Sequence, residues 1–235
     1  MTEPIKYYGT YTDDFGTTDI IILNDFKNLS LKIDEVEFKG SEFTALEIVD
    51  KNAYSTKQLE RFTLYSTKIY GTDDFVEEIC NCTFDITVPQ FIFDLQTQEQ
   101  FLADLKIRYV VGNERPKSSG GGLEFEKIYL TTKISDKVFE AQGDLFESIF
   151  ENIQNQFGGK YKLKNCFGCL YSDYSVYGQS ALGSMMCFVN QKDKYLEVKS
   201  KTEYMDNLTD DYDFVQEIFC CDKFKVRQKG TGYRG

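Results

Sequence analysis

Four cysteines in the C-terminal third of the chain have a spacing that suits a zinc ion. Cys166 and Cys169 form a C-x-x-C turn with a glycine inside, and Cys187 and Cys221 follow after 17 and 33 intervening residues. Structural zinc sites are commonly built from four thiolates, two of which lie on one tight turn. The spacing therefore predicts a structural zinc held by these four residues, and Cys220 is the neighbour of the last one.

The cysteines also have two other interpretations. Unpaired cysteines are among the most buried residue types, so the thiols could simply pack in a core. Cys166 and Cys169 could instead act as a redox pair, although the strand and helix that usually flank such a pair are not recognisable. Cys80 and Cys82 form a separate C-x-C in a strand-like segment, where both are expected to be buried on one sheet face. Seven cysteines without a visible export signal favour reduced thiols or a metal site over disulfides.

Histidine is absent from the sequence. This excludes Ser-His-Asp and Cys-His triads, HExxH metalloproteases and the commonest general base. The chain contains no GxSxG, SxxK or Walker motif, and no pair of carboxylates lies in a glycosidase or nuclease motif. The composition therefore favours a protein that binds over one that catalyses.

The chain is strongly acidic, with 27 Lys and Arg against 38 Asp and Glu and a formal charge of -11. This charge repels phosphate backbones, so we expect a cationic protein partner and no nucleic acid. Residues 201–213 hold five acidic residues and one lysine, which indicates either a solvated loop or an acidic docking surface. Nearby tyrosines suit an interface, or packing around the cysteine turn, because they are large and amphipathic. The partner-binding residues predicted here are Asp206, Asp210, Asp211, Asp213, Tyr174 and Tyr177.

Most of the first 143 residues read as short strands. Residues 30–38 alternate apolar and polar side chains apart from one adjacent acidic pair, which predicts a strand with a bulge. Similar runs between turn residues occur at 43–49, 62–65, 84–88, 105–111 and 123–134. Many short strands at such spacing are typical of an antiparallel sandwich or a rolled sheet.

One amphipathic helix is predicted over residues 145–157. Asp144 is its candidate N-cap, Glu147 lies three positions on, and Gly158 and Gly159 follow the apolar stripe. We expect this stripe to pack against the sheet.

The fold class predicted from these patterns is α+β. A β-rich body covers residues 1–143, and residues 144–235 contain the helix and a four-cysteine, zinc-knuckle-like module, with both parts packed as one unit. Weaker strand signals within the second part occur at 185–189, 195–199 and 214–219. The longest aliphatic run is far shorter than the roughly 20 residues of a membrane helix, and no signal peptide is visible, so we expect a cytoplasmic protein without a membrane partner.

The last 70 or so residues resemble an uncharacterised bacterial family, a domain of unknown function found in Bacteroidetes and Firmicutes. The shared pattern comprises C-x-x-C-x-Y-S-D-Y from Cys166 to Tyr174, Met-Cys-Phe at 186–188, Val-Gln-Glu-x-x-x-Cys at 215–221 and Gly-Tyr-Arg-Gly at 232–235. The pattern aligns its last cysteine with Cys221 rather than Cys220. The resemblance implies a gene context beside polymorphic toxins, and hence an immunity role.

Taken together, these observations predict a non-enzymatic protein that binds and neutralises a cognate, basic bacterial toxin or effector. The rival hypothesis is a zinc- or thiol-dependent enzyme or redox protein that uses Cys166 and Cys169.

Overall fold

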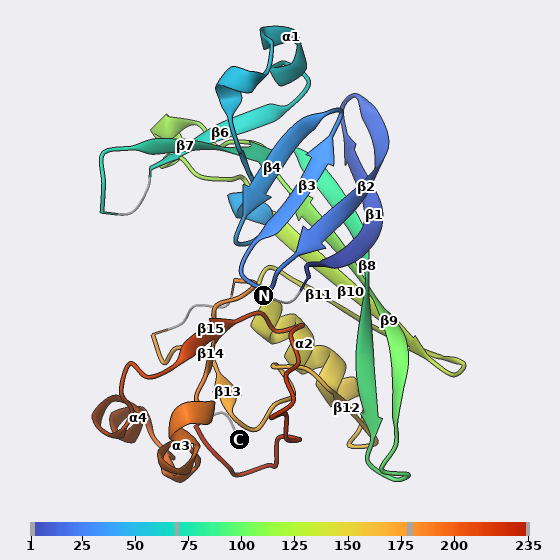
Figure 1. Cartoon of the computed structure of the whole chain (residues 1–235), viewed down its shortest axis with the longest axis vertical. Helices are drawn as coiled ribbons and strands as arrows, with labels where there is room; N and C mark the ends of the chain where they lie inside the picture. The colour runs from blue at the N-terminus through green and yellow to red at the C-terminus, as the bar shows by residue number, and fades with distance from the viewer. Residues whose placement is uncertain (1–2, 69–70, 178–180, 234–235) are drawn as a thin grey trace. The chain divides into compact units, whose positions relative to one another are not determined.

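The structure is a computed structural model that describes residues 3–68, 71–177 and 181–233. The chain forms two compact units (Figure 1). Unit 1 comprises residues 1–88, 105–131 and 142–144, and unit 2 comprises residues 89–104, 132–141 and 145–235. Segments 89–104 and 132–141 of the expected β-rich body therefore belong to the same unit as Cys166, Cys169, Cys187 and Cys221.

The fold is β-rich and antiparallel with few helices, as the α+β prediction requires. The main sheet has the strand order β11-β10-β9-β8-β1-β2-β3-β4-β5-β7-β6, and β12 pairs with β8 off this path. Its strands are β1 Ile5–Asp13, β2 Gly16–Asn24, β3 Leu29–Ile33, β4 Val36–Gly40, β5 Glu47–Ile48, β6 Thr63–Lys68, β7 Phe75–Cys80, β8 Cys82–Asp94, β9 Gln100–Val111, β10 Glu126–Ile134, β11 Lys137–Gly143 and β12 Tyr161–Leu163.

The predicted strand with a bulge at 30–38 is instead a hairpin. Ile33 pairs with Val36 across a two-residue turn, in which Asp34 and Glu35 have φ values of 46° and 71°. Positive φ at both turn positions matches the right-handed twist of the flanking strands. The adjacent acidic pair that interrupts the alternation is thus the turn between β3 and β4.

Aromatic side chains fill the core of unit 1. Tyr11 and Phe84 are fully buried with ring centroids 5.5 Å apart, and Phe43 stacks on Tyr109 at 5.1 Å. Buried aromatic pairs of this kind add to the stabilisation from apolar burial. Cys80 and Cys82 are also buried, as expected, although Asn81 between them has a φ of 51° and separates two strands.

Arg61 joins two hairpin turns of unit 1. Its guanidinium donates to Asp13 beside the β1–β2 turn and, at 2.9 Å, to Oδ2 of Asp34 in the β3–β4 turn. The guanidinium carbon also lies 4.9 Å from the ring centroid of Phe15. One side chain therefore pairs with two carboxylates and covers an exposed ring.

The predicted helix is α2, Phe146–Gln156. Phe146, Ile149, Phe150 and Ile153 form its buried face, which confirms the apolar stripe. The expected capping by Asp144 is wrong, because Leu145 holds the N-cap position and no side chain caps the helix. Phe150 packs on the ring of Phe167 at 5.2 Å, so the helix packs against the C-x-x-C turn, and Phe157 at its C-cap contacts Phe139 of the sheet at 4.9 Å.

The rest of unit 2 consists of short elements. A three-stranded sheet joins β13 Ser172–Asp173, β14 Met185–Cys187 and β15 Asp213–Val215, and the helices α3 Lys192–Glu197 and α4 Lys201–Asn207 lie in the chain between β14 and β15. The strand signal at 195–199 is therefore wrong, since most of that segment is helical. The remaining elements are η1 Phe43–Ala45, η2 Lys51–Ala53, α1 Thr56–Leu59, η3 Lys117–Ser119 and η4 Val189–Gln191. No helix in the described part of the chain is long and apolar enough to cross a bilayer.

Candidate functional site

The C-x-x-C turn lies between β12 and β13, and Asn165 and Gly168 determine its shape. The backbone N–H of Cys169 donates to the carbonyl of Cys166 at 3.1 Å, which closes the turn. Asn165 is fully buried, and its side-chain oxygen accepts from the N–H of Gly168 at 3.1 Å. A Cβ at Gly168 would stand only 2.0 Å from the carbonyl oxygen of Leu163, so the turn requires glycine at this position.

The end of the chain runs along this turn. The N–H of Cys166 donates to the carbonyl of Phe219 at 2.6 Å, and the N–H of Leu170 donates to Lys225 at 2.8 Å. These bonds place Cys221, which lies between the two acceptors, beside the turn. Cys187 comes from a third segment, strand β14, in which it pairs with Ser172 just after the turn.

The four predicted zinc ligands therefore converge from three segments of unit 2. Burial raises the pKa of the Cys166 thiol, and the neighbouring thiols that raise it further are those of Cys169, Cys187 and Cys221. Cys220 is also close to Cys169 and Cys221. All are free cysteines. Within residues 3–68, 71–177 and 181–233, however, no three Cys, Asp or Glu side chains are arranged to hold a metal ion.

The predicted partner-binding carboxylates lie on the surface of unit 2. Asp206 is in α4, Asp210 and Asp211 are in the following loop, and Asp213 begins β15; all four are exposed. Among the described residues, none of the four forms an ion pair. The acidic segment therefore presents uncompensated negative charge to solvent.

Buried Gln191 fixes the loop that carries these carboxylates. Its amide nitrogen donates to the carbonyls of Thr209 and Asp211, both at 2.9 Å, and its oxygen accepts from the N–H of Thr209 at 3.0 Å. Because a buried side chain makes three backbone bonds to it, the loop has a defined conformation.

The two predicted tyrosines have different environments. Tyr177 is 71% exposed, and the ammonium of Lys201 lies 5.1 Å from its ring centroid. Tyr174 is 3% exposed and donates its hydroxyl to Glu217 Oε1 at 2.8 Å. Tyr177 is thus accessible to a partner, whereas Tyr174 belongs to the core of unit 2.

A hollow of about 260 Å³ lies where the accessible tyrosine and the acidic loop meet. Aromatic rings, thioethers and one carboxylate form its walls, and we call it the tyrosine pocket. The residues that line it include Tyr177, Met186, Phe188, Tyr204, Met205, Asp210 and Tyr212. The structure therefore brings Tyr177 and Asp210 together and leaves Tyr174 out.

Two buried carboxylates beneath this surface were not predicted as functional residues. Glu217 is 0% exposed and accepts from Tyr174 and, at 2.9 Å, from the N–H of Gly183. Asp173 is 2% exposed and accepts from the hydroxyl of Tyr195 at 2.8 Å. Both residues occur in the C-terminal sequence pattern, which gave their positions but not their role.

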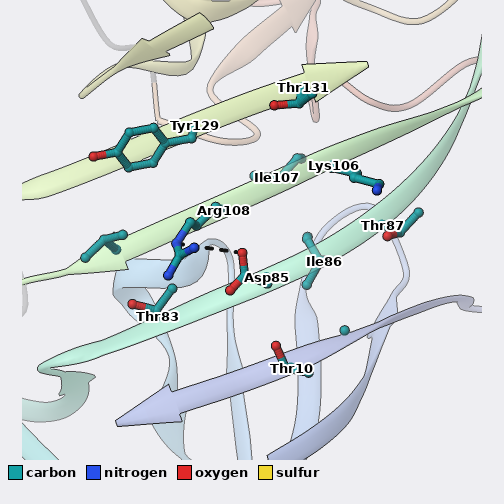
Figure 2. Close-up of a pocket in the computed structure, with 12 residues that line it drawn as sticks. Thr10, Thr83, Asp85, Ile86, Thr87, Lys106, Ile107, Arg108, Tyr129 and Thr131 are labelled. Atoms are coloured by element: carbon teal, nitrogen blue, oxygen red, sulfur yellow. Dashed lines mark ion pairs between the residues drawn. The ribbon is translucent and has the colours of Figure 1, made fainter. Parts of the chain in front are cut away.

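A second hollow, of about 860 Å³, lies on the solvent face of β1, β8, β9 and β10 in unit 1. Figure 2 shows Arg108 turned toward Asp85, and Lys106 further along the same strand. The distance from Nε of Arg108 to Oδ1 of Asp85 is 3.8 Å. Threonine hydroxyls and the Tyr129 phenol supply the other polar groups. This face can donate hydrogen bonds to a ligand, but its single carboxylate is paired with a cation.

The most perturbed carboxyl group of unit 1 is Glu42. Burial raises its pKa to about 7, and the carboxylates of Glu126 and Glu78 contribute. Each of these two neighbouring carboxylates accepts a hydrogen bond from a hydroxyl. Tyr109 donates to Glu126 and Thr67 donates to Glu78, each at 2.7 Å. Such shifts occur at acid–base sites as well as in cores, but Glu42 lines neither of the hollows described above.

Comparison with known proteins gives one match. The model of a Family of unknown function (DUF6304) matches residues 5–172 of this chain. The chain belongs to this family. No curated protein and no solved structure matches.

The prediction of an uncharacterised family is confirmed, although the match covers mainly the part of the chain that carried no resemblance. The DUF6304 match includes Cys166 and Cys169 and ends before Cys187 and Cys221. The last two residues of the Gly-Tyr-Arg-Gly pattern lie outside the described residues.

Proposed function

We propose that this DUF6304 protein is a non-enzymatic, cytoplasmic immunity-type protein that neutralises a cognate basic toxin or effector by stoichiometric binding. The observation that carries the proposal is the exposed carboxylate segment from Asp206 to Asp213, which has no ion pair within the described part of the chain. Unpaired surface charge of one sign accelerates association with a partner of the opposite sign.

Exposed aromatic and thioether side chains accompany this charge. Tyr177 is 71% exposed, Phe214 57% and Met205 52%. Aromatic residues and methionine are enriched at protein interfaces, and tyrosine is among the residue types that carry most of the binding energy. Carboxylates with Met205 and Phe214 beside them in the chain, and with Tyr177 in the adjoining pocket, favour a protein partner over a small metabolite.

The rival hypothesis, a thiol enzyme or redox protein, is less well supported. Cys166 and Cys169 are each 4% exposed. Reactive and redox cysteines are accessible to their substrates and lie in electropositive surroundings. The thiols of this turn instead face other cysteines.

The binding proposal is tested with the toxin encoded beside the gene in the native host. The chain should protect cells that express this toxin and form a tight 1:1 complex, and association should slow as salt rises. Reversing the charge of Asp210, Asp211 and Asp213 to lysine should slow association about tenfold or more. A matched triple reversal at exposed Glu60, Asp74 and Asp136, which gives the same net charge, should have a much smaller effect. Failure to bind and to protect would refute the proposal.

We also propose that Cys166, Cys169, Cys187 and Cys221 hold one structural zinc. Four thiolates are a closed donor set for this metal, and here they would join three segments of unit 2. Freshly isolated, unoxidised protein should contain about one zinc per chain by elemental analysis. Cys166→Ser should release it and lower the melting temperature strongly, whereas Cys220→Ser should be mild. Metal-free native protein, or equal losses in both variants, would contradict the assignment.

A further inference from the structure

We propose that the tyrosine pocket is a receptor for one cationic side chain, a lysine or arginine that a protein partner inserts. This inference rests on the proposed binding function and identifies the chemistry of the contact. The pocket combines aromatic ring faces with the carboxylate of Asp210, and both attract an ammonium or guanidinium group.

The aromatic residues that line the pocket are packed against one another and against buried Tyr195. Phe188 is 1% exposed, stacks on Tyr195 with centroids 4.9 Å apart, and meets the edge of Tyr204 at 5.6 Å. The ring centroid of Tyr212 lies 5.8 Å from that of Phe188. The hydroxyl of Tyr204 also lies 3.6 Å from the sulfur of Met186. Rings that are fixed before binding lose little conformational entropy when a ligand enters.

The chain itself shows that a ring of this pocket accepts a cation. The ammonium of Lys201 lies 5.1 Å from the centroid of Tyr177, within the range of a cation–π interaction. The same electrostatic attraction would act on a lysine or arginine from a partner that displaces Lys201 from this ring.

Charge and size favour a cationic occupant over an apolar one. Asp210 has no ion pair among the described residues, and an apolar side chain in the pocket would desolvate it without compensation. The volume of about 260 Å³ is below the roughly 300 to 1,000 Å³ of drug-sized ligand sites, which suits a single side chain. The thioethers of Met186 and Met205 can pack along its methylene stem.

The methionine methyl groups provide a site-specific readout. The chain has 4 methionines, of which Met186 and Met205 line the pocket, whereas Met185 is 0% exposed and does not. In protein with 13C-labelled methionine methyls, Nα-acetyl-lysine methylamide, which keeps its ε-ammonium group, should shift the Met186 and Met205 signals. The Met185 signal should stay in place. N-acetyl-norleucine methylamide, which has a similar stem without the charge, should shift neither. We expect weak, roughly millimolar affinity, because one side chain makes few contacts.

Two variants and one control sharpen the test. Asp210→Asn and Tyr177→Leu change exposed residues and should each weaken binding of the lysine probe about three- to fivefold. Asp74→Asn removes the same charge from an exposed position in unit 1 and should leave binding within about twofold. The methionine spectrum of each variant without probe shows whether it is folded.

The outcomes separate this inference from the binding proposal. If the lysine probe shifts neither pocket methyl, or if the norleucine probe shifts them equally, the pocket is not a cation receptor, even when the toxin complex forms through another surface. If the lysine probe binds as expected but no neighbouring toxin is bound, the receptor stands and the immunity proposal fails.

Discussion

The two units of this DUF6304 protein bury different kinds of side chain. Among the described residues of unit 1, the core is almost entirely apolar and aromatic, and the buried polar residues are Asn24 and Glu78. Unit 2 buries a larger polar set, which consists of Gln90, Thr132, Asn165, Ser172, Asp173, Gln191, Gln216 and Glu217. Long strands hold the backbone of unit 1, whereas side chains bond much of the irregular backbone of unit 2.

This difference indicates two ways to specify a fold. An apolar core between regular strands tolerates many hydrophobic substitutions, because the backbone ladder is satisfied without side chains. In unit 2, individual side chains such as Glu217 and Gln191 satisfy loop N–H and carbonyl groups. A buried network of this kind stabilises the structure only while every member has its partners.

The largest effect should come from Glu217→Ala in unit 2. The change leaves the Tyr174 hydroxyl and the Gly183 N–H without this acceptor and opens a cavity, so we expect a loss of about 4 to 5 kcal/mol in the free energy of unfolding. Urea denaturation measures it. Glu217→Gln, which keeps one acceptor oxygen, should lose less; a cost below about 2 kcal/mol for Glu217→Ala would remove the contrast between the units.

A slightly smaller effect is expected for Phe84→Ala in unit 1. Phe84 is 0% exposed and contacts the rings of Tyr11 and Phe43, so truncation creates an apolar cavity without orphaning a polar group. We expect a loss of about 3 to 4 kcal/mol. Phe84→Leu should recover most of it, since an apolar side chain again fills the site. Little recovery would mean that unit 1 also depends on one specific side chain.

Glu42 should make unit 1 sensitive to pH. Its folded-state pKa of about 7 lies above the ordinary 4.5, so the folded chain binds more protons than the unfolded chain between these values. Stability from this group is therefore present below about pH 4.5 and is lost as pH rises through about 7, by roughly 2 to 3 kcal/mol. Glu42→Gln should reduce the difference in unfolding free energy between pH 5 and pH 8. Exposed Glu60→Gln is the control, and equal pH profiles for all three proteins would contradict the prediction.

The smallest effects distinguish two tyrosines within unit 2. Tyr174→Phe removes a hydroxyl from a buried carboxylate and should cost about 1 to 2 kcal/mol, whereas Tyr177→Phe changes an exposed side chain and should stay within about 0.5 kcal/mol. Thermal melting of both variants under one condition tests this ordering. The reverse ordering would show that exposure does not decide which polar groups matter.

Regular patterns in the sequence predict the parts of the fold that depend on periodic burial. Alternation in 30–38 identifies the buried faces of β3 and β4, and helical spacing identifies α2. The strand expected at 195–199 fails because Tyr195 and Val198, both 0% exposed, are buried at helical spacing in a segment too short for periodicity to discriminate.

The candidate site was predictable in part for a similar reason. Cysteine spacing groups Cys166, Cys169, Cys187 and Cys221, and all four lie in unit 2, but the zinc site that the spacing predicts stays a prediction. The partners of Tyr174 and Asp173 depend on how loops fold back over tens of residues, and no local pattern encodes these contacts. The tyrosine pocket likewise needs residues from several short elements of unit 2.

Arg61 limits where this chain accepts extra residues. Surface hairpin turns are usually favourable insertion points, because few contacts depend on their length. Here the turns next to Asp13 and Asp34 are both tied to one guanidinium, so lengthening either would pull a carboxylate away from it. Residues 120–122 are glycines with open space around their Cβ positions. That loop is therefore the better place to insert a fluorescent reporter or an affinity tag without disturbing the hairpins.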